Sequence, residues 1–241
     1  MKNQLDTFKN AHKWLIIPLL IALIGFSNSY FLRFSEATWH QHMHGLSALF
    51  WYVMVIVQPY LINKGRIDLH KFYGLLSIFL AGAVTFSAIT IIAQNIESAN
   101  NYQPDSLIPK EFFYGVCFTD LLTTMGFGAS VIMGIITRKN INDHAIWMIS
   151  TVFWALMPAL SRLGLMPILA IYEYPPPFDL IDINTFMAPL IIFTILIICW
   201  RLKNWHPALI IVGIANISFL FLRQLGSNEV WQKFITSLLK Y

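Results

Sequence analysis

Three histidines, His70, His144 and His206, each begin an apolar stretch of the sequence. If these stretches are helices, each imidazole lies near a helix N-terminus, where the positive end of the helix dipole disfavours the protonated ring. Neutral imidazole is the form that binds a metal ion or a haem iron. His70 and His144 are therefore candidate cofactor ligands. The alternative is that a histidine at a helix end only bonds to water or to lipid headgroups.

The residues one helical turn beyond these two histidines bear on the kind of cofactor. Gly74 follows His70 and Met148 follows His144, each on the same helix face as its histidine. A porphyrin standing beside an axial histidine needs a gap such as the one that a glycine leaves. The four residues together predict a b-type haem or a metal ion at this level.

A second group of histidines lies in the segment Trp39-His40-Gln41-His42-Met43-His44. In a helix His40 and His44 share a face, and in an extended segment His40, His42 and His44 align. Imidazole with a nearby thioether suits copper. The sequence predicts a copper site here, or an exposed histidine run that binds nothing.

Three further polar residues fall within apolar stretches, where such residues usually face the interior of a helix bundle. Gln58 follows His44 by fourteen residues, which returns it to within about 40° of the same helix face. Asp120 and Arg162 are expected at a similar depth on antiparallel neighbours, so we expect them to form a structural ion pair. Arg162 also shares a face with His144, about five turns away, unless Pro158 kinks the helix between them.

The composition places all of these residues in a membrane protein. Of the 241 residues, 57% are hydrophobic and 12% are charged, with a mean hydropathy of +0.62. An ordinary soluble domain carries roughly 25% charged residues, so a soluble enzyme is excluded. The net charge of +4 does not indicate a nucleic-acid partner, because such proteins gather their basic residues on a soluble face. The expected partner is the lipid bilayer.

The chain contains seven stretches that reach or approach the roughly 20 apolar residues of a spanning helix. They form one transmembrane domain over residues 1–241, an all-α polytopic bundle, and the first is expected to be an uncleaved helix. The expected spans are residues 14–34, 44–62, 70–94, 112–136, 144–168, 185–200 and 206–223.

Lysine and arginine bias predicts the orientation, because cytoplasmic loops carry the excess. A cytoplasmic N-terminus puts ten basic residues inside and five outside, and most carboxylates outside. This places the protein in the cytoplasmic (inner) membrane, with an external C-terminus. Residues 227–241 are expected to form a short interfacial helix capped by Ser227, or a helix packed on the bundle. The ten inside residues are Lys2, Lys9, Lys13, Lys64, Arg66, Lys71, Arg138, Lys139, Arg201 and Lys203.

Three known kinds of membrane protein do not fit the pattern. No expected helix has a histidine at each end, as the two-haem arrangement of b561-type cytochromes requires. An alkaline-ceramidase-like metal site is disfavoured because Asp120 and the inner histidines lie at different depths. Residues 206–223 contain no lysine for a retinal Schiff base. The sequence leans away from an enzyme.

From His44 to about Leu169 the chain resembles a family of bacterial integral membrane proteins grouped as domain of unknown function 2306. The resemblance implies a multi-helix membrane domain with an inward-facing polar set, and it implies no activity, substrate or cofactor. His40, His42 and His206 are not part of the family pattern. The segments that carry it are His44-Gly45 with Gln58, then Arg66 with His70-Lys71-x-x-Gly74 (the family usually has His-Arg), and His144-x-x-Trp147-Met148-x-Ser150 with Arg162.

These observations favour a membrane protein that holds a b-type haem or a metal through His70 and His144. The corresponding role is redox chemistry or oxidase maturation, with a redox or oxidase-assembly partner. Two other classes stay open at this point. One is a transporter or a membrane protein that binds lipid or a small solute, and the other is a non-catalytic structural partner.

Overall fold

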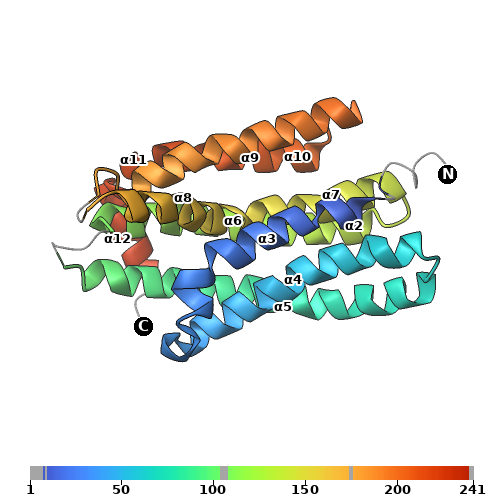
Figure 1. Ribbon diagram of the computed structural model, residues 1–241, viewed down its shortest axis with the longest axis horizontal. Helices are drawn as coiled ribbons and strands as arrows, with labels where there is room; N and C mark the ends of the chain where they lie inside the picture. Colours follow the sequence, from blue (N-terminus) through green and yellow to red (C-terminus); the bar gives the residue numbers. More distant parts are fainter. Residues whose placement is uncertain (1–7, 9, 104–107, 174–175, 239–241) are drawn as a thin grey trace.

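The computed structural model describes residue 8 and residues 10–103, 108–173 and 176–238, and every regular element in these ranges is helical. Lys2, Lys9 and Lys240 lie outside the described residues. Most helices run along the long axis of the molecule (Figure 1). They are α2 (Ala11–Trp14), α3 (Ile16–Gly25), α4 (Trp39–Asn63), α5 (Ile67–Asn100), α6 (Lys110–Ile136), α7 (Ile141–Ala155), α8 (Met157–Ile171), α9 (Leu180–Leu202), α10 (Pro207–Asn216), α11 (Leu222–Gly226) and α12 (Glu229–Leu238), with short π and 3-10 segments η1 (Ser27–Phe31), η2 (Phe34–Glu36) and η3 (Ile217–Phe221).

Five of these helical stretches are long and apolar enough to cross a membrane. Four of them, α4, α5, α6 and α9, contain the expected spans 44–62, 70–94, 112–136 and 185–200. The fifth runs continuously from Pro207 to Gly226 and covers the expected last span except His206. A sixth arises if the bent pair α7 and α8 is one span. The protein is therefore a multi-pass membrane protein.

The first expected span, residues 14–34, is divided in the structure. Helix α2 ends at Trp14 and α3 begins at Ile16, with Leu15 between them. Pro18 explains this break, because it has no N–H to donate to the carbonyl oxygen of Trp14 and its ring crowds that carbonyl. The helix ends at Gly25, and the π segment η1 carries the chain onward. The apolar helix of Ala11–Gly25 is shorter than the other candidates.

The fifth expected span, residues 144–168, is also interrupted. Helices α7 and α8 meet at Leu156 with a bend of 42°. The cause is again a proline, because Pro158 removes the backbone hydrogen bond to the carbonyl of Trp154. The bend directs α8 toward α3 and α9, whereas α7 packs on α4, α6 and α10.

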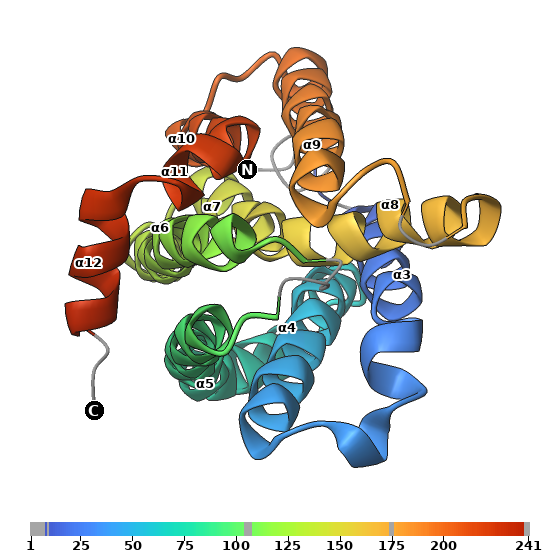
Figure 2. The same ribbon diagram turned by 90° about the vertical axis from the view of Figure 1, so that its left-hand side faces the viewer.

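Helix α7 forms the centre of the bundle (Figure 2). Of the nine side chains from Ile146 to Trp154, all but that of Met148 are buried. Two of its polar groups bond to neighbouring helices: Trp51 Nε1 of α4 donates to Thr151 Oγ1 at 3.0 Å, and Trp154 Nε1 donates to Ser130 Oγ of α6 at 2.8 Å. These bonds hold the helices that carry the candidate site in register.

The two ends of the bundle differ in charge. We call the end that holds the α4–α5, α6–α7 and α9–α10 connections the histidine end, because His70, His144 and His206 lie there; it is on the N-terminal side in Figure 1. Two described carboxylates, Asp68 and Asp143, lie at this end. Its described basic residues are Lys13, Lys64, Arg66, Lys71, Arg138, Lys139, Arg201 and Lys203.

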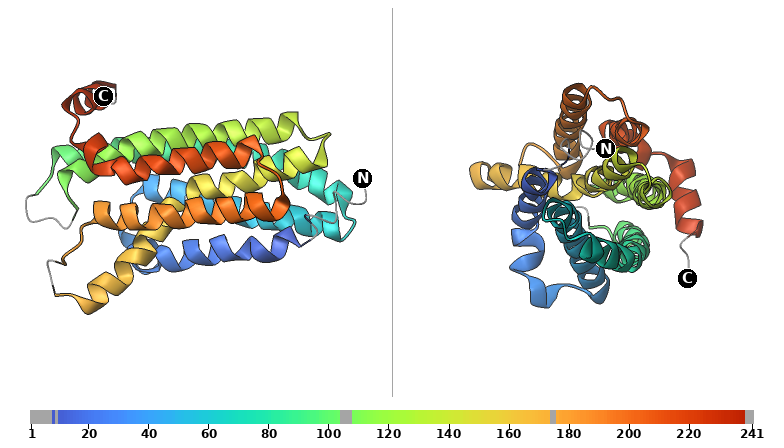
Figure 3. Two further views of the ribbon diagram at one scale, coloured as in Figure 1. Left: turned by 90° about the horizontal axis from the view of Figure 1, so that it is seen from above. Right: turned by 90° about the vertical axis from the view of Figure 1, so that its right-hand side faces the viewer.

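Helix α12 projects from the opposite end of the bundle (Figure 3). Its cap is Asn228, which accepts a hydrogen bond from the N–H of Trp231 at 2.9 Å, and not the expected Ser227. Trp231 Nε1 donates to the carbonyl of Tyr114 in α6 at 2.8 Å, and Ile235 is fully buried. Val230 and Phe234 stay exposed. The helix therefore packs on the bundle with one side and offers a second apolar side to its surroundings.

The packing of α3 on α8 depends on Gly25, because a Cβ there would collide with the backbone carbonyl of Ala159. We expect Gly25→Ala to lower the free energy of unfolding in detergent by about 1–3 kcal/mol through overpacking. Gly82→Ala is the matched control, because no atom lies within 4 Å of its added Cβ and alanine favours the helix. Equal thermal midpoints for the two variants would contradict this contact.

Candidate functional site

The structure brings His70 and His144 together at the histidine end. His70 lies in the first turns of α5 and His144 in the first turn of α7. Their ring centroids are 6.4 Å apart and the ring planes are perpendicular. Both side chains are half-buried. Two helices that are not consecutive in the chain thus supply one pair of imidazoles.

A backbone carbonyl fixes the tautomer of His144. Its Nδ1 lies 2.7 Å from the carbonyl oxygen of Gly134 in α6. A carbonyl oxygen only accepts, so Nδ1 carries the proton and Nε2 has a free lone pair. This arrangement is the usual one for a histidine that ligates a metal through Nε2. Met148, one turn on, packs against Gly134, with its Sδ 2.7 Å from where a Cβ on that glycine would lie.

Gln58 of α4 lies beside His70. With its amide nitrogen toward the histidine, Gln58 donates to His70 Nδ1 and to the His70 carbonyl oxygen at 3.2 Å. Its amide oxygen then accepts from the N–H of Gly74 at 3.0 Å. The Gln58 amide therefore covers Gly74, where a gap was expected, because the α4–α5 hairpin brings that side chain over the glycine.

His206 has a capping role at the same end. Its Nδ1 accepts from the N–H of Ala208 at 3.2 Å at the start of α10, which leaves the proton on Nε2. That nitrogen lies 3.5 Å from Asp143 Oδ1 of α7. The other oxygen of Asp143 accepts from Asn140 Nδ2 at 2.7 Å. Asp143 was not singled out from the sequence, although its place three residues after the cap Asn140 is a helix-start signal.

The outer histidines do not converge in the structure, as the expected copper site would require. His42 Nδ1 bonds to the Tyr30 hydroxyl at 3.0 Å, His44 Nδ1 bonds to Ser87 Oγ at 3.2 Å, and His40 is exposed. The segment is helical from Trp39, so successive side chains are turned by about 100° and His42 leaves the face of the other two. Within the described ranges, no group of three His, Cys, Asp or Glu side chains is placed to hold a metal ion.

His44 and Gln58 do lie on one side of α4. His44 bonds to Ser87 and Gln58 bonds to the start of α5, so both face the same neighbouring helix. This is the arrangement that their fourteen-residue spacing predicts.

Asp120 and Arg162, expected to form an ion pair, make no direct contact among the described residues, although the two charges still lie within electrostatic range of one another. Asp120 Oδ2 accepts from Asn95 Nδ2 of α5 at 3.3 Å. Arg162 bonds to Ser29 Oγ at 3.1 Å and to the Pro158 carbonyl at 2.9 Å. None of the ion pairs in the described part of the chain joins the two.

The bend at Leu156 explains this difference. It carries Arg162 toward α3, where its guanidinium lies 4.5 Å from the centre of the Phe26 ring.

No protein-family model, curated protein or solved structure matches the chain. The geometry of the site is therefore the basis for any functional proposal.

The contact between Asp143 and His206 ties α7 to α10 and is testable by comparison with Asp68, another acidic residue in a first helical turn. We expect Asp143→Ala to cost about 1–2 kcal/mol more stability than Asp68→Ala, because it also removes hydrogen-bonded partners. Thermal unfolding in detergent measures both variants. The proposed contact would be contradicted if His206→Ala lowered the stability by the same amount in the Asp143→Ala variant as in the unmodified protein.

Proposed function

We propose that this multi-pass membrane protein binds a b-type haem through His70 and His144. The observation that carries the proposal is the 6.4 Å separation of the ring centroids. Two imidazoles on opposite sides of one iron, each with an Fe–N bond of about 2 Å and a ring centre about 1 Å further, have centres about 6 Å apart.

His144 supports the same assignment. The bond of His144 Nδ1 to the Gly134 carbonyl leaves Nε2 available as a ligand. Gln58 donates to Nδ1 of His70 in the structure, so ligation of an iron through Nε2 of His70 would require the ring proton to move to Nδ1 and the Gln58 amide to turn its oxygen toward it.

The number of donors favours haem over a bare ion. A structural or catalytic zinc site needs at least three protein ligands, and the described residues offer no such set of His, Cys, Asp and Glu. A haem iron needs only two axial protein ligands. When bound in this way it supplies one-electron transfer. We therefore favour a redox role, or a role in oxidase maturation, with the electron partner approaching the histidine end.

We further propose seven crossings with a cytoplasmic N-terminus. The segment from α2 through η1 is the first crossing, and α7 with α8 is the fifth. The excess of basic residues at the histidine end supports a cytoplasmic location for that end, in the inner membrane. Membership of the family of domain of unknown function 2306 fits this arrangement, because His44, Gln58, His70 and His144 all lie on helices that pack together.

The haem proposal is tested by the absorbance of detergent-purified protein from haem-replete cells. We expect a Soret band and a reducible α-band with one haem per chain. His70→Ala and His144→Ala should each abolish the α-band, whereas His40→Ala should keep it because His40 is exposed at the other end.

Thermal midpoints show whether the two alanine variants remain folded. If folded protein with both histidines intact shows no Soret band after reconstitution with haem, the proposal is wrong. A solute-path or structural role for the polar residues would then remain.

The orientation is tested with two introduced thiols. Lys139→Cys lies in the α6–α7 connection and Ser98→Cys near the end of α5, and both positions are exposed. In intact cells we expect a membrane-impermeant maleimide to label Ser98→Cys, and to label Lys139→Cys only after permeabilisation. The native Cys117 and Cys199 are buried, so the unmodified protein serves as the blank. The reverse labelling pattern would invert the proposed topology.

A further inference from the structure

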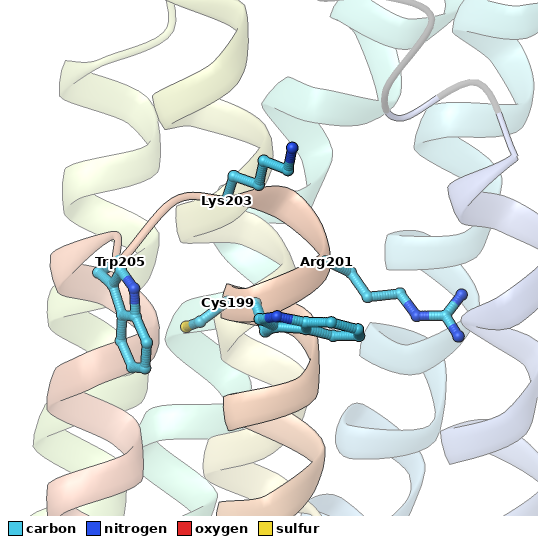
Figure 4. Close-up of a pocket in the computed structure, with 5 residues that line it drawn as sticks. Cys199, Arg201, Lys203 and Trp205 are labelled. Carbon is cyan, nitrogen blue, oxygen red and sulfur yellow. The ribbon is translucent and has the colours of Figure 1, made fainter.

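A cavity lies where α9 ends and α10 begins, at the histidine end but on different helices from the His70–His144 pair. It is open to the surface and has a volume of about 620 Å³. Figure 4 shows Lys203 and Arg201 extending from the end of α9, with Arg201 directed away from Trp205, which lies on the connection to α10. The lining residues are Cys199, Trp200, Arg201, Lys203 and Trp205.

The two cations of this cavity have no carboxylate partner among the described residues. None of the ion pairs there includes Arg201 or Lys203. Both side chains are exposed at the rim. Their long apolar stems let the charged groups move toward a ligand while the stems stay on the helix surface. The rim of the cavity therefore carries two positive charges that no described carboxylate neutralises.

Lys203 also has an unfavourable backbone conformation. Its φ is +48°, in the left-handed region, at the C-terminus of α9. Glycine is the residue that this position of a helix normally carries, because a side chain is disfavoured there. The left-handed turn places the Lys203 side chain at the rim of the cavity. The lysine thus occupies a position for which the backbone alone would favour glycine.

The indoles place the cavity at the level of lipid headgroups. Trp200 is 72% exposed and Trp205 is 61% exposed. Exposed tryptophans at the ends of apolar helices gather at the membrane–water interface. Below them, the outer surfaces of α9 and α10 are apolar and exposed, with Ile197 on α9 and Ile214 on α10. A molecule with a charged headgroup and an acyl chain matches a charged rim that is followed by exposed apolar helix surfaces.

We propose that this cavity binds an anionic phospholipid. The phosphate of the headgroup lies between Lys203 and Arg201, the indoles of Trp200 and Trp205 flank the glycerol region, and the acyl chains follow the apolar surfaces of α9 and α10. Basic pockets between helices on the cytoplasmic side are a known kind of site for acidic headgroups. The remaining cations of the histidine end add a general attraction, so the site must be separated from that background by experiment.

The test titrates phosphatidylglycerol and phosphatidylcholine into the full-length protein in a neutral detergent, and native mass spectrometry counts the bound lipid. Lys203→Gly and Arg201→Gln remove the two charges. We expect the affinity for phosphatidylglycerol to fall about fivefold for each and about 25-fold for both. Lys203→Gly should keep or raise the thermal midpoint, because glycine suits the left-handed position. Phosphatidylcholine should bind weakly in every case.

Arg138→Gln with Lys139→Gln is the control, because it removes two charges at the same end in another connection. We expect this pair to change the affinity by less than about twofold. An equal loss in the control would overturn the proposal, since it would show a diffuse attraction and no site. The proposal would also be overturned if inorganic phosphate or glycerol phosphate displaced the bound phosphatidylglycerol at the same concentration as added phosphatidylglycerol does. The cavity would then be a site for soluble anions.

Discussion

Polar groups inside an apolar bundle need partners within the bundle, and this requirement organises the protein around α7. Trp51 and Trp154 each use the indole N–H to reach a hydroxyl on a neighbouring helix, at 3.0 Å and 2.8 Å. Ser161 of α8 makes a similar bond of 2.7 Å to Asn184 of α9. An apolar contact between helices gains little in a lipid environment, whereas a hydrogen bond and close packing select one arrangement. These few bonds therefore specify which helices are neighbours.

The same requirement separates histidines that look alike in sequence. His70, His144 and His206 lie at one end of the bundle and all start helices, but each finds a different partner for Nδ1. The Gly134 carbonyl accepts from His144, the N–H of Ala208 donates to His206, and the Gln58 amide faces His70. His206 becomes a helix cap joined to Asp143, while the other two rings face one another. The candidate haem site is the facing pair, in which the contact of His144 leaves its Nε2 free.

Two prolines interrupt apolar segments of the bundle. Pro18 divides the first apolar segment, and Pro158 bends the fifth one by 42°. Beyond the bend, Arg162 lies over the ring of Phe26. The protein consequently holds a carboxylate and a guanidinium in its interior with separate neutral partners. At the histidine end, by contrast, the charges lie on connections and rims, where water and lipid headgroups can reach them.

Composition and helical spacing alone were sufficient to predict a multi-pass helical protein, most of its helix positions and the common end of the three histidines. Hydropathy and basic-residue bias are local properties of the sequence, so they do not depend on which helices pack against one another. The facing of His44 and Gln58 toward one helix also follows from their spacing. The partner of each polar side chain was decided only by the tertiary structure. The outer histidines diverge because their segment is helical, Gln58 covers Gly74 because α4 and α5 form a hairpin, and Arg162 misses Asp120 because Pro158 bends its helix. Each of these outcomes depends on a helix bend or on a contact between helices, and neither can be predicted from the spacing of residues along the sequence.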